Sequence, residues 1–105
     1  SESSGAISFM EFDRHLNQAR ELIIATLKLM SKFWRKVSHN CSVGELIEDG
    51  QLIHRSASEC RSHIRRLLKL SDSNISALRM YALYQSYVMN DKLAAHRLLN
   101  KWDQS

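Results

Sequence analysis

The feature that most constrains the fold is a long series of apolar residues that recur alternately four and three positions apart. This spacing puts side chains on one face of an α-helix, and over residues 9–37 it predicts a helix of about eight turns. Ser8 followed by Glu11 resembles a capping box and places the helix start near residue 9, so we expect residues 1–8 to be a polar, poorly ordered lead-in. The stripe consists of Phe12, Leu16, Ala19, Ile23, Thr26, Met30, Phe33 and Val37.

The same spacing returns after a short polar loop over residues 38–42. It predicts a second long helix over residues 43–70, and two long helices joined by a short loop must pack antiparallel as a helical hairpin. Gly50 falls on this stripe, where it either allows another helix to approach closely or marks a kink. The stripe consists of Leu46, Gly50, Ile53, Ala57, Cys60, Ile64 and Leu67.

Two shorter helices follow, separated by a tight turn at Asn90 and Asp91. They are expected over residues 75–88 and 94–102 and form a second, shorter hairpin. We therefore predict an all-α fold, a long hairpin followed by a short one, in a single domain over residues 9–105. The residues expected to line the two helices are Ile75, Leu78, Tyr81, Ala82, Gln85 and Val88, and then Ala94, Ala95, Leu98, Leu99 and Trp102.

Composition excludes several classes of protein. Apolar residues make up 44% of the chain, too many for a disordered protein, and the formal charge of +4 is mild for a nucleic-acid-binding domain. No apolar run approaches the roughly 20 residues that a membrane span requires. Two widely spaced cysteines make no disulfide framework and favour an intracellular, reducing compartment. Because the chain begins with Ser1 rather than methionine, we expect a segment of a larger protein.

Most of the chain resembles a known family: the pattern is clearest in the shorter hairpin, and Phe33 with Trp34 and residues 64–70 also fit it. Residues 77–84 read Ala-Leu-Arg-Met-Tyr-Ala-Leu-Tyr, residues 88–91 read Val-Met-Asn-Asp, and an alanine-led helix follows over residues 94–99. This order is similar to the TPR-like helical domain of TmcB/TmcC-type proteins. These are large protist proteins, often multi-pass membrane proteins and some with sensor domains that imply signalling. Ala82 and Ala94, with Leu98 four residues further on, also match the small and large positions of tetratricopeptide repeats.

The resemblance implies a TPR-like stack as an alternative to a four-helix bundle. It also implies a helical scaffold within a large membrane-associated protein, of which this chain would be a cytoplasmic part, and it implies no catalytic residues. The leucines off the main stripes are then expected to contact adjacent helical repeats. They are Leu22, Leu29, Leu83 and Leu93.

Metal binding and catalysis find little support. His39, Cys41, Cys60 and His63 have spacings that zinc sites use, but Cys60 would lie about 25 Å along its helix from Cys41, at ~1.5 Å per residue. A buried structural cysteine is the favoured interpretation, with zinc as a minor alternative. No nucleophile motif or glycine-rich phosphate loop occurs. We expect no enzyme activity and no cofactor.

A basic row is one candidate partner-binding site. Arg61, Arg65 and Lys69 recur at helical spacing, with Arg66 beside them, and such a row can bind an acidic protein or anionic lipid. A solvated helix face is the competing interpretation. No aromatic side chain interleaves with the row, so nucleic acid is the least expected ligand.

Aromatic residues give a second candidate site. Tyr84 and Tyr87 fall away from the stripe of their helix and are expected on a surface that meets a neighbouring segment, whereas Phe33 and Trp34 are expected in the interior. The predicted function is a non-enzymatic scaffold or protein-interaction segment whose partner is protein, with self-association left open. The alternative is a basic module that binds anionic lipid or nucleic acid.

Overall fold

The computed structural model describes the backbone of residues 2–103 and the side chains of residues 9–101. Within that range it contains four α-helices and no strand. The helices are α1 (Glu2–Ser38), α2 (Val43–Leu70), α3 (Ile75–Leu83) and α4 (Lys92–Asp103), and a π-helical segment, η1 (Tyr84–Val88), continues α3. The predicted all-α fold with a long and then a short hairpin is confirmed.

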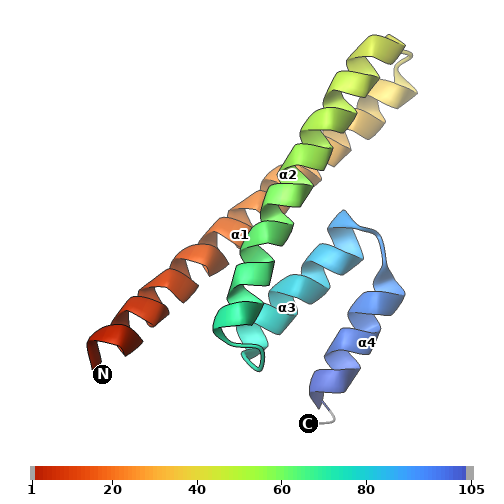
Figure 1. Cartoon of the computed structure of the whole chain (residues 1–105). Coiled ribbons are helices and arrows are strands. Elements are labelled where there is room, and N and C mark those ends of the chain that lie inside the picture. The colour runs from red at the N-terminus through yellow and green to blue at the C-terminus, as the bar shows by residue number, and fades with distance from the viewer. Residues whose placement is uncertain (1, 104–105) are drawn as a thin grey trace.

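The shorter hairpin lies beside one half of the long hairpin (Figure 1). The loop that joins α1 to α2 is at the far end, so the tip of the long hairpin extends beyond α3 and α4. The chain measures 57 × 31 × 14 Å along its principal axes. The molecule is therefore elongated and flattened, and α3 contacts both α1 and α2 of the long hairpin.

Helix α1 begins earlier than predicted. Its first residue is Glu2, so residues 2–8, expected as an unordered lead-in, continue the helix, and Ser8 and Glu11 lie inside it. The segment contains no proline and one glycine, Gly5, and therefore nothing that stops a helix. Ser1 and the side chains of residues 2–8 lie outside the described part of the chain.

Helix α2 has the predicted bounds. The Ser42 hydroxyl accepts a hydrogen bond from the Glu45 backbone N–H at 3.2 Å, which satisfies one of the free donors at the start of the helix. Gly50 neither breaks the helix nor permits a close approach. The helix is continuous through it, and no atom lies within 4 Å of the position that a Cβ would occupy.

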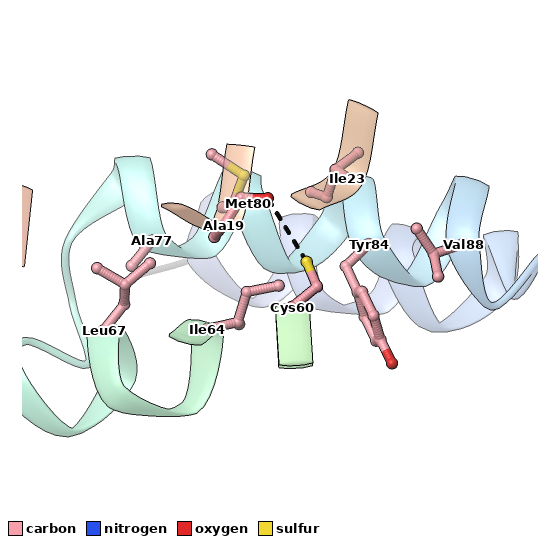
Figure 2. Packing of buried hydrophobic residues seen from close by; sticks show 9 residues of the cluster. All are labelled: Ala19, Ile23, Cys60, Ile64, Leu67, Ala77, Met80, Tyr84 and Val88. Atoms are coloured by element: carbon pink, nitrogen blue, oxygen red, sulfur yellow. Dashed lines mark hydrogen bonds between the residues drawn. The ribbon is translucent and has the colours of Figure 1, made fainter. Parts of the chain in front are cut away.

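The core forms where the two hairpins meet. Figure 2 shows the buried side chains converging from α1, α2, α3 and η1, with the Cys60 thiol donating to the Ala19 carbonyl oxygen at 3.5 Å. The predicted stripes of α1 and α2 supply five of the members. The cluster consists of Ala19, Ile23, Cys60, Ile64, Leu67, Ala77, Met80, Tyr84 and Val88.

Burial decreases toward the tip of the long hairpin, because only two helices are present there. Met30 and Phe33 are half-buried, and Val37 is exposed. Trp34, predicted in the interior, is 62% exposed and touches the Phe33 ring edge-on, with ring centroids 5.4 Å apart. The prediction for Trp34 is therefore wrong, because no third helix covers this part of α1.

Polar contacts fix the register of α1 against α2. The buried Thr26 hydroxyl lies 2.6 Å from the Ser56 hydroxyl and donates to the Leu22 carbonyl oxygen, also at 2.6 Å. Near the turn, the Lys36 ammonium lies 2.8 Å from Asp49 and 3.1 Å from Glu45. Hydrogen bonds to Asp49 first and then to Glu45 raise the pKa of Lys36. Cross-helix hydrogen bonds thus run from the middle of the hairpin to its tip.

Candidate functional site

The turn between α3 and α4 shapes the shorter hairpin. In η1 the Met89 backbone N–H donates to the Tyr84 carbonyl oxygen at 3.0 Å. This acceptor is five residues back instead of four, so the turn contains one residue more than a turn of α-helix. Asn90 follows with a φ of 55°, in the left-handed region that asparagine tolerates. The Asp91 carboxylate then caps α4 by accepting the Ala94 N–H at 3.0 Å. The chain therefore reverses within three residues and lays α4 along α3.

A groove lies between α3, η1 and α4, with a volume of about 450 Å³; we call it the α3–α4 groove. Ala82 and Ala95 are buried at its floor, and their small side chains let the two helices approach closely. Leu83, Tyr87 and Leu99 form its walls and are 45%, 54% and 42% exposed. Three large apolar side chains thus remain accessible in one concave surface.

Polar residues surround this apolar surface. Arg79 comes from α3, Ser86 from η1, and Lys92 and His96 from α4. Leu83 was among the leucines expected to contact neighbours, and it does line the groove. The positively charged residues were not predicted as site residues, because only the turn at residues 89–91 brings Lys92 opposite Arg79.

The two predicted tyrosines have opposite environments. Tyr84 is only 3% exposed and belongs to the core, so its prediction as a surface residue is wrong. The face of α3 and η1 that joins the core runs through Ala77, Met80, Tyr84 and Val88, of which only Val88 was on the predicted stripe. Burial raises the pKa of Tyr84, although the nearby positive charges of Arg61 and Arg65 oppose the shift. Tyr87 is exposed in the groove and stays a candidate.

The basic row on α2 is divided by its contacts. Arg61, Arg65 and Lys69 are exposed. Arg66 instead turns toward α1, where its guanidinium lies 3.4 Å from a carboxylate oxygen of Glu11. All four predicted basic residues are therefore on the surface, and Arg66, whose side chain is 56% exposed, also contacts α1.

A histidine pair also crosses the α1–α2 contact. The Nδ1 atoms of His15 and His63 lie 2.8 Å apart, and their ring centroids are 5.1 Å apart. Burial first, and then the neighbouring His63, lower the pKa of His15. One ring nitrogen must carry a hydrogen and the other must accept it, so the pair holds the two helices together only while at least one ring is neutral.

The remaining sequence features are widely separated. Cys41 lies at the tip of the long hairpin and Cys60 in the core, and both are free thiols. Among residues 9–101, no three histidine, cysteine, aspartate or glutamate side chains are grouped as metal ligands. None of the helices described is both long and apolar enough to cross a membrane.

Comparison with known proteins identifies a family. The family model described as "TmcB, TPR repeats" matches residues 1–105. Neither the curated proteins nor the solved structures contain a match to the chain. The family match agrees with the resemblance of residues 77–99 and with the stacked helical hairpins of the structure. The chain belongs to the TmcB TPR repeat family.

Proposed function

We propose that this chain is a non-enzymatic scaffold segment that binds protein partners through the α3–α4 groove. The observation that carries the proposal is the exposure of Leu83, Tyr87 and Leu99 within one concave surface. Burying these side chains against a partner would remove apolar area from water, at about 25 cal/mol per Å² before the costs of association. Helical repeats in general serve as such scaffolds, because each repeat leaves a face for its neighbour.

The position of α4 supports this function. Helix α4 packs against α3 and η1, while the long hairpin lies on the other side of α3 (Figure 1). In a stack of helical hairpins, such an outer helix receives the next element of the assembly. We extend the proposal to a larger, membrane-associated signalling protein in a reducing compartment. The family resemblance and the two free thiols support that extension.

A pull-down with matched variants tests the groove. The double variant Leu83→Ser/Tyr87→Ser should lose partners that the unchanged chain retains, since it removes two walls of the groove. Leu93→Ser is the control, because Leu93 is 58% exposed on α4 but does not line the groove. Far-UV circular dichroism should show that both variants are folded. If the double variant retains every partner, the proposal is wrong.

A second candidate function is binding of anionic lipid or nucleic acid by the basic row. The observation that favours it is the exposure of Arg61, Arg65 and Lys69 along α2. Raising the ionic strength to about 0.5 M should abolish such binding, whereas contact through the groove should persist. The double variant Arg61→Glu/Arg65→Glu should abolish it as well. Binding that survives this change would exclude the basic row.

A further inference from the structure

The α3–α4 groove carries charged residues of one sign. Arg79 and Lys92 line it together with His96, and none of its lining residues is an aspartate or glutamate. Among residues 9–101, no carboxylate lies within ion-pair distance of Arg79 or Lys92. These two cations therefore lack a neutralising partner within the described part of the chain, and a partner molecule can supply one.

The start of α4 lies at one end of the groove. Lys92 is the first residue of α4, at the end of the helix where backbone N–H groups give a partial positive charge, and the first turn contains no acidic residue. The Asp91 carboxylate accepts the Ala94 N–H at 3.0 Å and offsets the partial charge of this helix end. The positive charge that the groove offers a partner is therefore that of the Arg79 and Lys92 side chains.

The shape of the groove suits a helix. Its walls come from two helices that run alongside each other, and its apolar members Leu83, Tyr87 and Leu99 are exposed toward the same space. A helix with apolar residues at positions i, i+3, i+4 and i+7 can lay that face into such a surface. Residues that flank its apolar face then meet Arg79 and Lys92 at the rim.

We propose that the α3–α4 groove binds an amphipathic helix of a partner protein whose apolar face is flanked by glutamate or aspartate residues. This inference rests on the proposed function of the groove and adds the chemistry of the partner. The apolar contact supplies most of the affinity, and the rim charges select acidic over basic helices and fix their orientation. Binding is consequently weakened, but not abolished, by salt.

Selection from a displayed peptide library tests the inference with the full chain as bait. The probe is a library of helices about 18 residues long, with a fixed leucine stripe and flanking positions that vary among glutamate, glutamine and lysine. The expected result is enrichment of glutamate at the flanking positions. An enriched peptide, synthesised with a fluorophore, is then measured by fluorescence anisotropy against its all-glutamine and all-lysine counterparts.

Charge-reversal variants locate the effect. Arg79→Glu and Lys92→Glu should each weaken binding of the enriched peptide by about tenfold, since an attractive pair becomes repulsive. Arg97→Glu is the matched control. It makes the same change of charge on α4 at an exposed residue outside the groove, and it should change the affinity by less than about twofold.

The outcomes separate the inference from the proposed function. Helices that bind equally well with glutamine or lysine flanks, but are lost in Leu83→Ser/Tyr87→Ser, would refute the acidic partner and leave the groove as a protein-binding site. No helix binding above background would refute the inference, while the pull-down with Leu83→Ser/Tyr87→Ser decides the proposed function separately. Concentration-dependent association of the chain alone, abolished by Lys92→Glu in analytical ultracentrifugation, would show that a second copy occupies the groove and would also refute the inference.

Discussion

The two tyrosines of η1 provide a direct test of how this segment faces the core. Tyr84 is 3% exposed and Tyr87 is 54% exposed, although they are the same residue type three positions apart. A tyrosine side chain buries about 150–250 Å², which at about 25 cal/mol per Å² corresponds to roughly 4–6 kcal/mol for Tyr84. Residual burial in the unfolded chain reduces this to about 3–4 kcal/mol. Tyr84→Ala should lower the free energy of unfolding by that amount.

Tyr87→Ala should cost much less. Its ring keeps about half of its surface in water, and no element covers it, so we expect a loss of about 1 kcal/mol or less. Urea denaturation followed by far-UV circular dichroism measures both variants. Domains of this size are stable by only about 5–15 kcal/mol, so Tyr84→Phe, which keeps the ring, is included as a variant that stays folded. It should lose less than about 1.5 kcal/mol.

Equal losses for the two alanine variants, or a larger loss for Tyr87→Ala, would refute the reasoning. Either result would mean that residues 84–88 do not adopt the π-helical register that turns Tyr84 toward α2. Arg79 and Lys92 would then no longer be expected to line the same groove. The stability of two point variants therefore also tests the surface on which the proposed function depends.

Other contacts lead to three further expectations. Leu67→Ala, at a fully buried position, should lower the free energy of unfolding by about 2–5 kcal/mol in urea denaturation, and exposed Leu93→Ala by less than about 0.5 kcal/mol. Burial raises the pKa of the Cys60 thiol to about 11, so a thiol reagent at neutral pH should modify Cys41 in the folded chain and Cys60 only after unfolding. Because burial lowers the pKa of His15 from 6.5, the unfolded chain binds more protons below that pH, and stability should fall as the pH decreases through about 6.5. Thermal unfolding at several pH values should show this fall, and His15→Gln should reduce it.

The long hairpin was predictable because its signals agree with one another. The apolar stripe of α2 lies between the Ser42 cap and the loop at residues 71–74, and the helix has the predicted bounds. The start of α1 was misplaced because a serine followed three residues later by a glutamate is also compatible with a helix interior. Only the absence of a helix breaker before residue 9 could have indicated the longer helix.

The shorter hairpin was less predictable for a physical reason. Helix α3 is covered by the long hairpin on one side and by α4 on the other, so apolar residues occur around much of its circumference. Several stripes then fit the sequence. The predicted one included Tyr81 and Gln85, while the structure buries Met80 and Tyr84. Nothing in the sequence distinguished the π-helical turn from an ordinary one, and that turn decides which residues face the core.

The tip of the long hairpin is also apolar, yet its charges make it a weaker candidate for partner binding than the groove. Trp34, Val43 and Ile47 are exposed there. The nearby Lys36 is already neutralised by carboxylates of its own chain, at 2.8 and 3.1 Å. At the rim of the groove, Arg79 and Lys92 form no ion pair with any carboxylate among the described residues. Exposed apolar side chains are common on small helical proteins. The groove differs because it combines a concave apolar surface with unpaired positive charge. One partner helix can cover the apolar surface and neutralise that charge.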